Sequence, residues 1–294
     1  MTARIGVLPN TSLMSTDHRH HLDDASLPDI ITGTTRDRVT GMDIRIDRMG
    51  EGTTLVVLNG LLGLNAHWFP TIAPLADRVE SLCIQPPILE MRGKGATVQG
   101  VSSLVVSCLE SLLDGPAVIM GNSLGGHIAL RIAHARPDLV RALVLIGSSG
   151  LLERGFEKGV RHTPTPDWIY TKVRELFYSE KSILPGMVEM VHEELSRRPA
   201  ARAFVKLGRS AKVDHLGSIL PEIGVPTQLI WGRQDIVTPP SVAEQFARDL
   251  PDARLAWLDD CGHAPHIEYP DAVRAVLTGF LDELEQRQSQ HSVA

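Results

Sequence analysis

The chain has little cysteine and no long apolar run, and each shortage excludes a class of protein. Its three cysteines, Cys83, Cys108 and Cys261, are too few in 294 residues for a disulfide framework. A reducing, cytoplasmic setting is therefore expected. No apolar run reaches the roughly 18 residues that a membrane span needs. The first 24 residues hold no continuous apolar stretch of the kind found in signal peptides, so we predict none.

Basic residues are not in excess. The formal net charge is −6, whereas a nucleic-acid-binding protein usually presents a basic face. The apolar fraction of 43% and the charged fraction of 22% are those of an ordinary globular protein. We therefore expect a small-molecule substrate as the partner, with no nucleic acid and no membrane span, and leave the oligomeric state open.

The N-terminal segment lacks hydrophobic periodicity. Residues 1–28 are rich in His, Asp, Ser and Thr, and we expect a loosely ordered tail there, with a short C-terminal tail at 289–294. His18, His20 and His21 are weak evidence for metal binding, because no second cluster of ligands accompanies them. No metal site is predicted.

Short apolar segments recur from residue 42 onward, each bounded by Gly, Pro, Asn or Asp. Such segments are typical of buried strands in a parallel sheet. The predicted strands are Met42–Arg48, Thr54–Leu58, Ser81–Ile84, Ala117–Met120, Ala142–Ile146, Thr227–Trp231 and Ala256–Leu258. Helical periodicity covers residues 97–113, 124–136, 241–249 and 270–286. The alternation predicts an α/β fold with a mostly parallel central sheet flanked by helices.

One stretch interrupts this alternation. Residues 151–221 show helical patterns at 168–177, 187–195 and 200–207 but no convincing strand, so we predict a helical cap inserted into a core of residues 29–150 and 222–288. Five aromatic residues fall in the insertion. One or more of them is expected to line a pocket, and the others to pack the cap on the core: Phe156, Trp168, Tyr170, Phe177 and Tyr178.

Ser123 lies between a predicted strand and a predicted helix, within Gly121-Asn122-Ser123-Leu124-Gly125. A G-x-S-x-G sequence is a weak pattern alone, but a strand before it and a helix after it are the context of a nucleophile elbow. The sharp turn strains the serine backbone and crowds its neighbours, which explains the glycines at 121 and 125. A serine on this turn also lies at a helix N-terminus, where N–H groups favour negative charge.

A serine hydroxyl needs a base, and the base needs a carboxylate to orient it. His263 follows the last predicted strand in Asp259-Asp260-Cys261-Gly262-His263, and we prefer it to His266. Asp235 follows the strand that ends near Trp231. The order Ser, Asp, His along the chain, with each residue at the end of a strand, is that of α/β-hydrolases.

Two backbone N–H groups are expected to form an oxyanion hole. One belongs to Leu124, directly after the serine, and the other to Leu61, in the loop after the strand that ends at Leu58. Candidate substrate-pocket residues are Asn59, Leu62, Asn122 and Trp168.

Four segments, Asn59–Gly63, Gly121–Gly126, Trp231–Asp235 and Gly262-His263, resemble in this order the motifs of the α/β-hydrolase superfamily. The resemblance spans about residues 40–286 and implies the α/β-hydrolase fold. Within the superfamily the chain looks like lidded serine hydrolases, which include small esterases and meta-cleavage-product hydrolases. Gly-Asn-Ser-Leu-Gly-Gly is similar to the nucleophile motif of the latter.

Several positions depart from these relatives. Asn59 stands where many have histidine, Leu61-Leu62 is bulkier than the loop of the meta-cleavage group, and Ala264 replaces an aromatic residue usual in that group. Serine rather than aspartate at 123 separates the chain from haloalkane dehalogenases and epoxide hydrolases.

We therefore expect a serine hydrolase that cleaves a carboxylic ester of a small, largely apolar substrate with the triad Ser123, Asp235 and His263. No cofactor is needed for this chemistry. Two alternatives remain open. Asn122 favours a C–C bond hydrolase acting on a vinylogous diketone, and the fold alone is also compatible with a ligand receptor.

Overall fold

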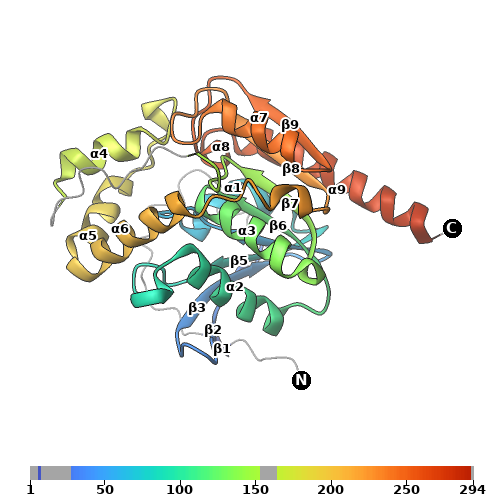
Figure 1. Cartoon of the computed structure of the whole chain (residues 1–294), viewed down its shortest axis with the longest axis horizontal. Coiled ribbons are helices and arrows are strands. Elements are labelled where there is room, and N and C mark those ends of the chain that lie inside the picture. The colour runs from blue at the N-terminus through green and yellow to red at the C-terminus, as the bar shows by residue number, and fades with distance from the viewer. Residues whose placement is uncertain (1–5, 8–27, 153–163, 293–294) are drawn as a thin grey trace.

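The central element is a nine-stranded sheet, seen in a computed structural model that describes residues 6–7, 28–152 and 164–292 (Figure 1). The strand order is β1-β2-β3-β5-β4-β6-β7-β8-β9. The strands are β1 Gly6–Val7, β2 Ile31–Arg36, β3 Asp43–Met49, β4 Thr53–Leu58, β5 Val79–Gln85, β6 Ala117–Asn122, β7 Val140–Ile146, β8 Thr227–Gly232 and β9 Ala253–Leu258.

The relative direction of neighbouring strands changes across the sheet. The pairs β1/β2, β2/β3 and β3/β5 are antiparallel, whereas every pair from β5 through β4, β6, β7 and β8 to β9 is parallel. The chain moves outward from β4 to β5 and then crosses to β6 on the other side of β4. Such a reversal opens a crevice at the carboxyl ends of the strands, where α/β proteins bind ligands.

Helices cover both faces of the sheet. Helices α2 (Val98–Leu112), α3 (Leu124–Ala135) and α7 (Pro240–Asp249) pack on one face, and α1 (Phe69–Ile72) and α9 (Pro270–Ser292) on the other. The strand period of two divides the side chains of β6 between these layers, with Ile119 in the first and Val118 and Met120 in the second. In the described part of the chain, no helix is both long and apolar enough to span a membrane.

Three helices lie between β7 and β8 in the chain. We call α4 (Pro166–Arg174), α5 (Met187–Ser196) and α6 (Arg198–Val213) the inserted helices. They share a small apolar core that includes Ile169, Val191 and Phe204, and they project to one side of the sheet (Figure 1). Ser210 of α6 accepts a hydrogen bond from the backbone N–H of Val98, which ties the inserted helices to the start of α2.

All seven predicted strands and the helices between them are present, with ends that differ by a few residues. The longest extension is α9, which continues to Ser292. The sequence analysis missed β2, whose sequence Ile-Thr-Gly-Thr-Thr-Arg has one large apolar residue and is defined by antiparallel pairing with β3. Of the predicted N-terminal tail, residues 6–7 form β1, whereas 1–5 and 8–27 lie outside the described residues, as do His18, His20, His21 and Phe156.

Gly125 fixes how closely α3 approaches β4. A Cβ at this position would lie 2.2 Å from the carbonyl oxygen of Leu58, and a Cβ at Gly121 would lie 2.4 Å from the carbonyl carbon of Gly125. These neighbours are backbone atoms, which cannot rotate away as a side chain does. The two glycines therefore set the geometry of the turn between β6 and α3.

We predict that Gly125→Ala lowers the free energy of unfolding by about 1–3 kcal/mol or more, because the methyl group would displace the backbone of β4. Gly115→Ala is the matched control, since no atom of residues 6–7, 28–152 or 164–292 lies within 4 Å of a Cβ built there. Urea denaturation of both variants measures the difference. Equal midpoints for the two variants would contradict this account of the turn.

Candidate active site

Ser123 occupies a strained turn at the carboxyl end of β6. Its φ of 53° and ψ of −116° lie in a region that residues other than glycine rarely adopt. Its backbone N–H donates to the carbonyl of Ile146 at 3.0 Å, which holds the turn against β7. Leu124 begins α3, so its N–H has no carbonyl partner within that helix. The turn thus places a hydroxyl beside an N–H group directed out of a helix N-terminus.

His263 and Asp235 form a buried hydrogen-bonded pair. The Nδ1 of His263 lies 2.8 Å from Oδ2 of Asp235, and both side chains are almost completely buried. The other carboxylate oxygen of Asp235 accepts the backbone N–H groups of Val237 and Thr238 at 2.8 and 2.9 Å. The loop that follows Asp235 therefore holds its carboxylate in one orientation. The carboxylate in turn fixes the imidazole of His263, whose Nε2 points away from Asp235.

Thr238 belongs to the same cluster. Its hydroxyl donates to Oδ2 of Asp235 at 2.8 Å and lies 3.2 Å from both Nδ1 of His263 and the carbonyl oxygen of Gly147. Gly147 has a φ of 49°, and a Cβ there would come within 3.2 Å of both His263 and Asp235. Sequence analysis missed Thr238, because a threonine in a loop carries no signal until the aspartate beside it has a known partner.

Two asparagines brace the site through backbone and side-chain contacts. Asn122 donates its amide hydrogens to the carbonyls of Ile146 and His263, both at 3.0 Å, so it joins the serine turn to the histidine loop. Asn59 receives a hydrogen bond from the indole N–H of Trp68 at 2.9 Å and donates to Asn65 at 2.6 Å. Asn122 borders the cavity described next, whereas Asn59 is not among its lining residues.

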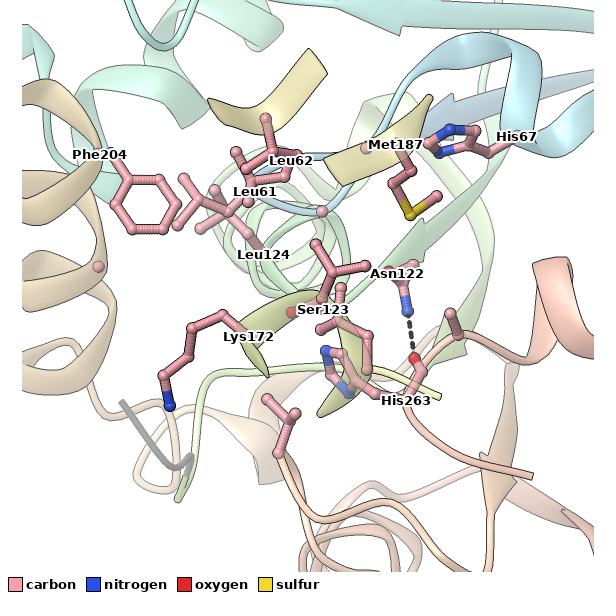
Figure 2. A pocket seen from close by; sticks show the side chains of 18 of the residues that line it. Leu61, Leu62, His67, Asn122, Ser123, Leu124, Lys172, Met187, Phe204 and His263 are labelled. Carbon is pink, nitrogen blue, oxygen red and sulfur yellow. Dashed lines mark hydrogen bonds between the residues drawn. The ribbon is translucent and has the colours of Figure 1, made fainter. Parts of the chain in front are cut away.

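A cavity of about 130 Å³ is lined by most of the sequence-predicted residues, but not by Asn59 or Asp235. Ser123 and His263 lie side by side in it (Figure 2), and Asn122 and Trp168 also line it. Its remaining wall is mainly apolar and comes from the loop after β4 and from the inserted helices. The predicted residues on the loop and at the start of α3 are also lining residues: Leu61, Leu62 and Leu124. Lys172 borders the cavity as well, but its ammonium points away from Ser123 (Figure 2) and pairs with Glu175 at 2.7 Å.

Of the aromatic residues predicted in the insertion, Trp168 and Phe177 line the cavity. Tyr170 and Tyr178 are exposed. The exposure of the two tyrosines differs from the expectation that aromatic residues outside the pocket pack the cap on the core.

A second serine, histidine and aspartate set lies nearby. Ser149 Oγ is 3.5 Å from Nδ1 of His127, and Nε2 of His127 is 3.1 Å from Asp214. Although burial works against it, hydrogen bonds from His127 and Arg131 keep the pKa of Asp214 below its ordinary value. Arg131 pairs with both carboxylate oxygens of Asp214, so this aspartate is neutralised by a permanent cation rather than reserved for the histidine. Burial lowers the pKa of His127.

The two sets differ most at the serine. Ser149 follows the end of β7, and the described residues directly after it, Gly150–Leu152, form no helix. Ser123 has both the strained turn and the first N–H of α3. The Ser123 set is thus the one equipped to stabilise an oxyanion.

Glu268 connects the histidine loop to the inserted helices. One carboxylate oxygen accepts the backbone N–H of Gly262 at 2.6 Å, and the other accepts those of Tyr178 and Ser179 at 2.9 and 3.4 Å. The N–H of His263 donates to the carbonyl of Leu176 at 2.8 Å. The segment that follows α4 and the loop that carries His263 therefore share one hydrogen-bonded unit.

His266 lies beside His263 in the cavity wall and is buried. It stacks on Trp68 with ring centroids 4.0 Å apart, and its Nδ1 has no hydrogen-bond partner among the described residues. Burial lowers its pKa well below the ordinary value of 6.5, and the nearby His67 and His263 act in the same direction. His266 is therefore neutral near pH 7.

The described residues contain no group of three or more His, Cys, Asp or Glu side chains arranged to hold a metal ion. The three cysteines are buried and free of disulfide bonds. Burial raises the pKa of the Cys108 thiol to about 12, so this cysteine is a weak nucleophile at neutral pH.

We predict that Glu268→Gln lowers the free energy of unfolding by about 1–3 kcal/mol. Both carboxylate oxygens of Glu268 accept hydrogen bonds from backbone N–H groups. In glutamine one oxygen is replaced by an NH₂ group, which cannot accept, so the backbone N–H groups on that side would lose their acceptor. Glu90→Gln is the control at an exposed glutamate and is expected to change stability by less than about 0.5 kcal/mol. If urea denaturation shows no difference between the two variants, Glu268 does not join these segments.

Stability is also expected to depend on pH through His266. Because its folded-state pKa lies below 6.5, the unfolded chain takes up a proton as pH falls through 6.5 while the folded chain does not. The stability from this residue is present above pH 6.5 and is lost below it, by up to about 1.4 kcal/mol per pH unit. His266→Phe keeps a ring against Trp68 and should make denaturation curves between pH 6.5 and 5 less pH-dependent. Equal slopes for variant and wild type would contradict the prediction.

The comparisons with known proteins agree with this architecture. Residues 55–276 match the model of the alpha/beta hydrolase family. The chain is 31% identical over 242 residues to a pimeloyl-[acyl-carrier protein] methyl ester esterase of Aromatoleum aromaticum, covering 74% of this chain and 93% of the relative.

Two solved structures illustrate the likeness of the fold. An alpha/beta hydrolase enzyme, MGS-MChE2, from the metagenome of lagoon sediments at Mar Chica, Morocco, is 29% identical with a TM-score of 0.68, covering 86% of this chain and 99% of that one. The 2-hydroxy-6-oxo-6-phenylhexa-2,4-dienoate hydrolase of Rhodococcus sp. strain RHA1 is 20% identical with a TM-score of 0.70, covering 88% and 99%. From the sheet order, the turn at Ser123 and the match over residues 55–276, the chain belongs to the alpha/beta hydrolase family and is a hydrolase.

Proposed function

We propose that the chain is a serine hydrolase that cleaves the carboxylic ester of a small, largely apolar substrate through an acyl-enzyme. The observation that carries the proposal is the buried 2.8 Å contact between Asp235 and His263, which lines the same cavity as Ser123. Nucleophile, base and orienting acid are the three parts that acyl transfer by serine requires.

In this mechanism His263 accepts the proton of Ser123 as the hydroxyl attacks the ester carbonyl. Asp235 holds the imidazole in the tautomer whose Nε2 is free and stabilises the imidazolium that forms. His263 then protonates the leaving alcohol. Water attacks the acyl-enzyme with the same base, and the acid is released.

The oxyanion is assigned to the backbone N–H groups of Leu61 and Leu124. Both residues border the cavity, and Gly60, directly before Leu61, packs against Ser123 so closely that an added Cβ would lie 3.4 Å from the serine Cβ. Each donor of this kind is typically worth about 10²–10³ in turnover. The inserted helices act as a cap that closes the cavity above Ser123.

The preference for an ester rests on two observations. The Aromatoleum relative is named as an esterase. Asn122, which favoured the C–C bond hydrolase, uses both amide hydrogens on backbone carbonyls and so cannot donate them to a substrate. The likeness to the dienoate hydrolase is a likeness of fold.

Replacing Ser123 by alanine is expected to lower the turnover of p-nitrophenyl butyrate by about 10⁴-fold or more, since the nucleophile is lost. Ser103→Ala, on the exposed face of α2, is the control and should keep wild-type turnover. Retained hydrolysis in the Ser123 variant would rule out the proposed nucleophile.

Labelling with a fluorophosphonate probe followed by peptide mapping separates the remaining alternatives. Label on Ser123 supports the proposal, label on Ser149 would transfer the role to the second set, and absence of label would favour a ligand receptor.

A parallel assay with a meta-cleavage dienoate tests C–C hydrolysis. Faster turnover of the dienoate than of nitrophenyl esters would overturn the preference for an ester substrate.

A further inference from the structure

The cavity has two unlike ends. Ser123, Asn122 and His263 lie together on one side in Figure 2, with His67 above them. Phe204 of α6 lies on the other side, beyond Leu61 and Leu124. The wall toward α6 therefore consists of apolar side chains, whereas the polar groups gather where the chemistry is proposed to occur.

Position 208 of α6 is a glycine inside a 16-residue helix, and it borders the cavity. Glycine is among the poorest helix formers, and at position 208 it leaves the wall of the cavity without a side chain. Among the residues that the structure describes, none has an atom within 4 Å of a Cβ built at Gly208. Because Gly208 also borders the cavity, a side chain added there would have open space to extend into.

The chemistry indicates which part of an ester extends toward Gly208. The leaving alcohol must lie near His263, which protonates it, and the acyl group projects from the other side of the carbonyl carbon. In Figure 2 Phe204 and His263 lie on opposite sides of Ser123. The α6 side of the cavity is thus on the acyl side of the reacting carbonyl.

The volume limits the length of that group. The cavity measures about 130 Å³, and an apolar protein cavity of about 150 Å³ holds a molecule the size of benzene. Because the reacting carbonyl and the alcohol share this volume, about six carbons is the upper limit for the acyl chain.

We propose that Gly208 determines acyl-chain length: an unbranched acyl group of up to about six carbons extends from Ser123 along the apolar wall and ends against the backbone of α6 at Gly208. This inference rests on the proposed ester hydrolysis. It identifies the substrate class as medium-chain acyl esters and assigns a specificity role to a residue that carries no reactive group.

The test measures kcat/KM of the purified full-length chain for p-nitrophenyl acetate and p-nitrophenyl hexanoate. In Gly208→Leu, the ratio of hexanoate to acetate is expected to fall at least tenfold, because the new side chain occupies the end of the acyl site. Gly208→Ala should lower the ratio less and raise the melting temperature, since alanine favours the helix. Gly279→Leu is the matched control: it lies within α9, is exposed, borders no part of this cavity and also has an open Cβ position.

A second pair of substrates, ethyl acetate and hexyl acetate, varies the alcohol instead. An unchanged acyl ratio in folded Gly208→Leu, or a tenfold fall in the hexyl to ethyl ratio with no fall in the acyl ratio, would overturn the assignment of Gly208 to the acyl chain. An equal fall in the acyl ratio of Gly279→Leu would do the same. Failure of the wild-type chain to hydrolyse any of these esters would instead overturn the proposed function.

Discussion

The rest of the site depends on the close contact between the start of α3 and the end of β4. Gly125 lies against the carbonyl of Leu58, and this approach allows the chain to turn at Ser123 with a positive φ. The strain of that turn is held by the surrounding sheet, because Ser123 also donates its N–H to β7. A larger residue at 125 would separate the helix from the strand and remove the turn that exposes the hydroxyl.

Around this turn, loops from separate strands are joined by hydrogen bonds to backbone atoms. Asn122 reaches the carbonyl of His263, Thr238 lies between Asp235 and His263, and Glu268 links the histidine loop to the segment after α4. These contacts hold the imidazole in a fixed orientation, which a proton-transfer group requires. They also connect the position of the imidazole to the inserted helices that form much of the cavity wall.

The presence of two serine, histidine and aspartate sets in one protein shows that residue types alone do not define a site. In the second set Arg131 occupies both oxygens of Asp214, and burial lowers the pKa of His127. In the first set the aspartate has backbone N–H groups, a threonine and the histidine as partners, and the serine adjoins a helix N-terminus. Local electrostatics and backbone geometry, rather than composition, distinguish them.

Local sequence patterns were sufficient to predict the alternation of strands and helices, the turn at Ser123 and the three candidate residues at strand ends, because periodicity and glycine placement are local properties. It missed β2, whose identity depends on pairing with β3, and Thr238 and Glu268, whose partners lie elsewhere in the fold. It named Asn59 as a pocket residue, whereas the tertiary structure uses that side chain to brace Trp68 and Asn65. The surfaces that enclose the cavity, and the absence of a described neighbour beside the Cβ position of Gly208, could not be predicted locally, because both depend on how α6 packs against distant parts of the chain.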